Sequence, residues 1–159
     1  MSSKMVCWCV RAAVIMMALC GLLLCGFLLP LNGYTTLRDH PQDAHFVWSW
    51  LGLLWGVSLP CFAVLVYAWK VSTAIKADQV FTTQTAKWIK SAALMLFAAV
   101  GLLAVGNVVL ALLGLSGPPA IVPSFFIIIF GSALAAFAAV LSRYVAKAAV
   151  LREDSEGTV

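Results

Sequence analysis

The residues best suited to chemistry gather in one short polar segment. Asp39, His40, Asp43 and His45 fall within seven residues of one another. Carboxylate and imidazole side chains at such spacing can hold a divalent ion. The alternative is a solvated loop whose charges keep it out of lipid, since the sequence offers no obvious nucleophile or second shell to accompany them. We therefore expect no catalytic residue, no metal site required for activity and no cofactor, and metal binding by residues 34–45 stays an open alternative.

The cysteines form no recognisable framework. Cys7 and Cys9 precede the first apolar run, whereas Cys20, Cys25 and Cys61 lie inside apolar runs, where cysteine behaves as a small hydrophobic residue. A Cys-Trp-Cys pair can bind a soft metal, but a second pair or a nearby histidine is needed to complete such a site. We expect free thiols.

The composition is that of a membrane protein. Hydrophobic residues make up 64% of the chain and charged residues 10%, against roughly 45–50% and 25% in soluble globular proteins. The net charge of +4 is distributed at the ends of apolar blocks instead of along one stripe. That distribution serves orientation in a bilayer, so we predict the lipid bilayer as a partner and no direct contact with nucleic acid.

Four uncharged blocks predict the fold class: an all-α, polytopic protein with four transmembrane helices arranged as two hairpins. Pro30, Asn32 and Gly33 should end the first helix, and the Gly- and Pro-rich residues 114–119 should separate the last two. The blocks define a single domain of residues 1–159. Its predicted parts are helices at about 12–32, 46–69, 85–115 and 121–148, a cytoplasmic connector with its own helix at 70–90, and a flexible tail at 150–159.

Six residues are candidates for helix packing. Gly52 and Gly56 are four residues apart, which lets a neighbouring helix approach closely, and Pro60 should kink the helix near Gly56. Asn107 is the one strongly polar side chain deep in a span, so we expect it to form an interhelical hydrogen bond. The fourth helix contributes small residues at helical spacing, among them Gly131 and Ala135.

The positive charges predict the topology. Only Arg38 falls on the side of the first and third turns, and the other basic residues fall on the opposite side. Basic residues favour the cytoplasmic face, so both termini and the connector should be cytoplasmic. The residues on that side are Lys4, Arg11, Lys70, Lys76, Lys87, Lys90, Arg143, Lys147 and Arg152.

The connector contains helix-start features. Thr82 is a plausible N-cap, and Phe81 before it is placed to pack on the first helical turn as a hydrophobic staple. Lys87, Trp88 and Lys90 should follow at the membrane interface, with the ammonium groups near lipid phosphates.

The connector also resembles a known family. The run Gln79-Val80-Phe81-Thr82-Thr83-Gln84-Thr85, followed by Trp88-Ile89, resembles the Gly-x-Val-Phe-Ser/Thr-x-x-Asn motif of domain-of-unknown-function family 2975. Asp78 stands where the family usually has Gly, and Thr85 where it usually has Asn. The charged tail from Arg152 to Val159 is similar to the family's C-terminal ending.

This resemblance implies a multi-pass protein of the bacterial inner membrane without an assigned activity. Similar members are often encoded beside a small helix-turn-helix transcription regulator, which implies a cytoplasmic DNA-binding regulator as partner. The motif lies on the side that such a regulator can reach. The candidate docking residues are Val80, Phe81, Thr82, Thr85 and Trp88.

Two functions follow as expectations. The first is an interaction or signalling protein that docks a cytoplasmic regulator. The alternative is a small transporter or efflux-type subunit, acting as a homo-oligomer with a pore lined by Asn107, Ser58 and Ser132. Proton-coupled transport normally requires ionisable groups within the spans, and the apolar blocks hold none. We expect no enzymatic activity, because no base, nucleophile and metal ligand share one depth.

Overall fold

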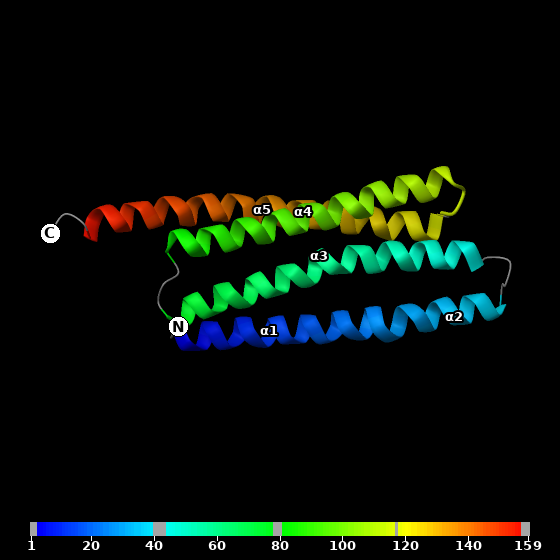
Figure 1. Ribbon diagram of the computed structural model, residues 1–159, viewed down its shortest axis with the longest axis horizontal. Coiled ribbons are helices and arrows are strands. Elements are labelled where there is room, and N and C mark those ends of the chain that lie inside the picture. The colour runs from blue at the N-terminus through cyan, green and yellow to red at the C-terminus, as the bar shows by residue number, and fades with distance from the viewer. Residues whose placement is uncertain (1–2, 40–43, 78–80, 117, 157–159) are drawn as a thin grey trace.

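The protein is entirely helical. The computed structural model describes residues 3–39, 44–77, 81–116 and 118–156. Four long rods run back and forth along one direction, and the first is built from three successive segments (Figure 1). The elements are α1 (Ser3–Leu23), the π-helical turn η1 (Leu24–Leu28), α2 (Leu29–Asp39), α3 (Ala44–Lys76), α4 (Thr83–Leu112) and α5 (Pro118–Glu156).

Each rod is long and apolar enough to cross a membrane. Large apolar side chains lie on the outside, as with Leu112, Phe130 and Phe137, which are 83%, 67% and 69% exposed. Small residues fill the interior instead: Ala93 is 2% exposed and Ala135 is fully buried. Lipid tails tolerate exposed apolar surface, whereas close helix packing in a bilayer requires small side chains. The structure thus supports four transmembrane helices.

The rods form a row and do not close into a bundle. Contacts join α1 to α3, α3 to α4, and α4 to α5 (Figure 1). Within the described parts of the chain, no Cα atom of α1 lies within 8 Å of one in α4 or α5, and the same holds between α3 and α5. The central helices therefore each have two neighbours, and the first and last rods have one.

The first rod continues past its expected end. We predicted that Pro30, Asn32 and Gly33 would stop it, yet the helix runs on as α2 to Asp39. The π-turn explains how. In η1 the amide of Leu29 donates to the carbonyl of Leu24, five residues back. This wider turn lets the helix pass a proline, which cannot donate and whose ring crowds a normal α-turn.

Gly114 sets the conformation of the turn between α4 and α5. Gly114 has φ +70, and the amides of Gly114 and Leu115 donate to the carbonyls of Ala111 (3.0 Å) and Leu110 (2.8 Å). These two bonds form a Schellman motif, which ends a helix with glycine in the left-handed conformation. The predicted break between the last two helices is therefore confirmed.

The predicted connector helix is wrong. Helix α3 continues to Lys76, and α4 begins at Thr83, so the helical residues described in segment 70–90 belong to these two helices and form no separate one. The end of α3 stays helical because Ser72 and Ala74 are buried there. At the other terminus, α5 continues as a helix to Glu156, beyond the predicted end near 148 and into the segment expected to be a flexible tail.

Candidate functional site

The start of α1, the end of α3, the start of α4 and the end of α5 lie at the same end of the molecule (Figure 1). We call this the basic end, because these segments carry every lysine and arginine except Arg38, which is at the end of α2. The structure thus brings together the charges that the sequence placed on one side. Thr83, in the connector motif, and Val150, on α5, line one groove at this end.

The connector motif begins α4 with a side-chain cap. Thr82 has extended φ and ψ values of −124 and 152, and its hydroxyl oxygen accepts the amide of Thr85 at 3.2 Å. The two threonine hydroxyls are also 3.0 Å apart. The predicted N-cap at Thr82 is confirmed. Thr85, which replaces the usual Asn of the resembled motif, supplies a partner for the cap.

The candidate docking residues differ in exposure. Phe81 is 50% exposed, Thr82 and Trp88 are partly buried, and Thr85 is 1% exposed. Val80 lies outside the described residues. Thr85 therefore supports the helix start from inside, and Phe81 is the side chain of this group that reaches the surface most. Direct docking by the group stays a prediction.

A second cluster fastens α1 to the end of α3. The Cys7 thiol donates to the Ser72 carbonyl (3.3 Å), and the Ser72 hydroxyl donates to the Cys7 carbonyl (3.4 Å). Arg11 donates to the Thr73 hydroxyl (3.4 Å) and stacks over Trp69, 5.0 Å from the ring centroid. Sequence reasoning missed this cluster. The four-residue spacing of Cys7 and Arg11, which puts both on one helical face, was the available signal.

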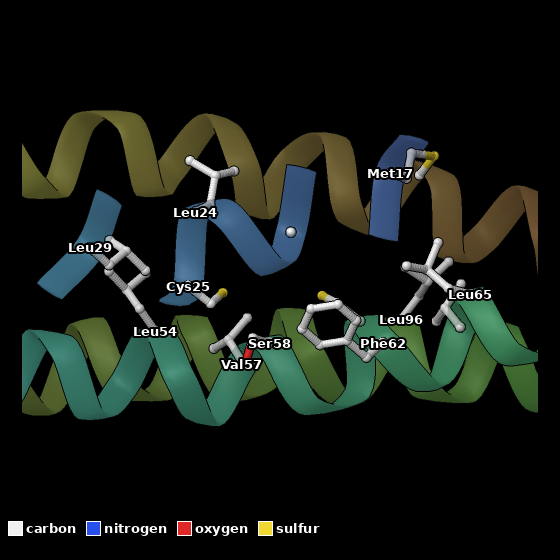
Figure 2. A pocket seen from close by; sticks show the side chains of 13 residues that line it. Met17, Leu24, Cys25, Leu29, Leu54, Val57, Ser58, Phe62, Leu65 and Leu96 are labelled. Carbon is white, nitrogen blue, oxygen red and sulfur yellow. The ribbon is translucent and has the colours of Figure 1, made fainter. Parts of the chain in front are cut away.

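An apolar groove lies between the first rod and α3. It has a volume of about 470 Å³, and Figure 2 shows Cys25, Val57 and Phe62 among the side chains between the two helices. Ser58 also lines it, but its hydroxyl donates to the Trp55 carbonyl in its own helix at 2.7 Å. The groove presents an apolar surface, suited to an acyl chain or to another apolar side chain.

Two indole groups connect the rods. Trp55 donates to the Cys25 carbonyl at 3.1 Å, within η1, and Trp50 donates to the Leu115 carbonyl at 2.9 Å, in the α4–α5 turn. Both rings lie in the first half of α3. Their hydrogen bonds depend on the π-turn and on the glycine turn, neither of which the ring positions alone could indicate.

The predicted packing glycines have unequal surroundings. A Cβ atom on Gly131 would come within 2.7 Å of a Val100 methyl group, and one on Gly56 within 3.5 Å of Leu102. Gly52 has open space there, so its role in close packing stays a prediction. Gly106, which the sequence reading did not select, lies directly against Leu53. Helix α3 changes direction near its middle (Figure 1), and Pro60 is the midpoint of its range.

Asn107 is buried, but its visible hydrogen bond is not the expected one. Its amide group donates to the Leu103 carbonyl in the same helix at 2.9 Å. Its Oδ1 atom is buried without a hydrogen-bond partner in the described structure. The interhelical bond that we expected is therefore replaced by a bond to its own backbone. Of the other candidate pore residues, Ser132 is half-buried on α5. Transport stays an alternative.

The polar segment between the first two rods is only partly described. Asp39 ends α2, and His45 is in the first turn of α3, whereas His40 and Asp43 lie outside the described residues. Within the described ranges, no three His, Cys, Asp or Glu side chains come together as a metal site would require. Metal binding by residues 34–45 therefore stays as open as the sequence left it.

Four apolar rods with charges at their ends define the class of this molecule, a multi-pass membrane protein. The chain belongs to the DUF2975 family, described as protein of unknown function, whose family model matches residues 33–159. The match begins within α2 and includes all of α3, α4 and α5. No curated protein matches the chain, and no solved structure does.

Proposed function

We propose that this protein is a membrane-anchored interaction protein that docks a soluble regulator at its basic end, with that end in the cytoplasm. The observation that carries the proposal is the overhang of α5. The helix has 39 residues, which corresponds to ~58 Å at ~1.5 Å per residue, against ~30 Å for the hydrocarbon core. Its C-terminal turns extend past the start of α4 (Figure 1).

The overhang and the connector offer one composite surface. Phe81 provides an exposed aromatic ring, a side-chain type that commonly anchors protein interfaces. The last turns of α5 add the exposed Lys147 and Arg152. A helix end that is already ordered can bind a partner without ordering a disordered segment first. The family resemblance suggests a helix-turn-helix regulator as that partner, and the docking role requires no enzymatic chemistry.

The test is a pull-down of the tagged chain from detergent-solubilised membranes, probed for a co-expressed helix-turn-helix protein encoded beside the gene. Phe81→Ala should reduce recovery by about tenfold, because an interface hot spot contributes roughly 1.4 kcal/mol or more. Tyr34→Ala is the matched control, since Tyr34 is an exposed aromatic residue, 74% exposed, in the first rod near the opposite end of the molecule.

Equal recovery with Phe81→Ala and the unaltered chain would contradict the proposal. Thr82 is unsuitable for this test, because its hydroxyl also caps α4. A change there would confuse loss of docking with loss of the helix start.

A further inference from the structure

A second groove lies at the basic end, between the first turns of α4 and the last turns of α5. It has a volume of about 500 Å³. Small residues line its inner part: Ala86 and Ala93 are 6% and 2% exposed, and Ser142 is 6% exposed with its hydroxyl donating to the Ala139 carbonyl at 2.7 Å. Because these side chains are short, a groove stays open between the longer side chains on either side.

The wall formed by α4 changes character along its length. Lys87, Lys90, Leu94 and Phe97 all line the groove, and their spacing of three, four and three residues puts them on one helical face. Lys90 and Phe97 are separated by ~10 Å along the axis. One face of α4 therefore passes from two ammonium groups to two large apolar side chains within the same groove.

Helix α5 adds a third positive charge opposite this face. Arg143 lines the groove together with Ala139, Ala146 and Val150, which also share one face by spacing. Lys87, Lys90 and Arg143 are exposed, and no acidic residue is among the described residues that line the groove. The positive end therefore has no negative side chain within the described lining to balance it.

The depth of these charges matches that of lipid headgroups. The residues of α4 after Lys90 and those of α5 before Arg143 are uncharged, so the three cations stand where the apolar spans begin. Leu94 and Phe97 lie one and two turns deeper. A ligand that fits both parts has an anionic head and an apolar tail in line with it.

We propose that this groove binds an anionic phospholipid, with the phosphate among Lys87, Lys90 and Arg143 and an acyl chain along Leu94 and Phe97. Charge complementarity identifies the head, and the continuous apolar wall identifies the tail. Free phosphate shares the head chemistry but leaves the apolar wall unused. An acidic peptide of a partner protein is the competing occupant, and the experiment below distinguishes it from the lipid. The inference is independent of the proposed regulator and of the side of the membrane.

The experiment is native mass spectrometry of the full chain in detergent, titrated with phosphatidylglycerol or with phosphatidylcholine of the same acyl chains. The chain should retain phosphatidylglycerol with about tenfold preference, and Lys87→Gln/Lys90→Gln should remove most of that preference. Lys70→Gln/Lys76→Gln is the matched control, because both lysines are exposed at the basic end on α3 and neither lines the groove. It should keep the preference.

Further arms separate the sources and guard against misfolding. Lys87→Arg/Lys90→Arg should keep the preference, since it retains the charge. Inorganic phosphate at the same concentration should not displace the lipid. Phe81→Ala should leave lipid retention unchanged even where it abolishes capture of the regulator, so the two proposals fail separately.

Several results would overturn the inference: equal retention of the two lipids, equal loss of preference in the α3 control, or displacement by inorganic phosphate alone. Loss of regulator capture in Lys87→Gln/Lys90→Gln with an intact lipid preference would also do so, because the groove would then belong to a protein partner.

Discussion

Trp55 satisfies a carbonyl that the first rod leaves open. In η1 the Leu29 amide is used by the Leu24 carbonyl, and the residue five positions after Cys25 is Pro30, which has no amide hydrogen. The Cys25 carbonyl therefore loses its usual backbone donor, and the Trp55 indole donates to it instead at 3.1 Å. In a bilayer, where water is scarce, such a bond also fixes the distance between the first rod and α3.

We expect Trp55→Phe to lower the free energy of unfolding by about 0.6–2 kcal/mol, because the ring remains and one hydrogen bond across two helices is lost. Thermal or denaturant unfolding in detergent, followed by circular dichroism, measures the change. Trp48→Phe is the control, because Trp48 is 62% exposed on the same helix. Equal effects of the two substitutions would show that the indole hydrogen bond contributes nothing specific.

At the scale of elements, α4 and α5 pack closely at Gly131, because glycine has no side chain. Gly131 faces Val100 so closely that an added Cβ would stand 2.7 Å from a Val100 methyl group. We expect Gly131→Ala to cost about 1–3 kcal/mol, because the added methyl group pushes the helices apart. Unfolding in detergent measures this as well.

Gly101→Ala is the matched control for that substitution. Gly101 lies on α4 with open space around an added Cβ, and alanine favours a helix more than glycine does. The control should therefore be neutral or slightly stabilising. A Gly131→Ala protein as stable as the Gly101→Ala protein would contradict the close packing of α4 and α5.

The four helices were predictable from sequence because each is a long apolar block bounded by charges or turn residues. The roles of Gly114 and Thr82 were also predictable, since glycine at a helix end and threonine before a helix have direct backbone roles. Pro30 misled us. A proline stops a helix unless a wider turn precedes it, and nothing in the run Leu24–Leu28 distinguishes a π-turn from an α-turn.

The site was less predictable than the fold. The positions of Lys87 and Lys90 at an interface were readable from the chain, but the opposing Arg143 is more than fifty residues away in the sequence. The groove between them exists only once α4 and α5 pack. The supposed connector helix failed for a similar reason, because burial of Ser72 against α1 extends α3 beyond the end that its hydropathy indicates.

At the scale of the whole molecule, the charges make a prediction about sidedness. We expect a fluorescent protein fused after Val159 to fluoresce, and alkaline phosphatase inserted within residues 40–43 to be active. Basic segments remain in the cytoplasm, where the first reporter folds and the second does not become active. Phosphatase inserted at residue 80 is the control and should be inactive. The reverse pattern of activity would place the basic end outside the cell.

The row of helices has a consequence for biogenesis. Every contact between rods in the described structure joins helices that follow one another along the chain. Each newly synthesised segment therefore meets its packing surface in the segment that entered the bilayer immediately before it, and no early segment waits for a late one. The helices of this protein can therefore pack in the same order in which the ribosome makes them.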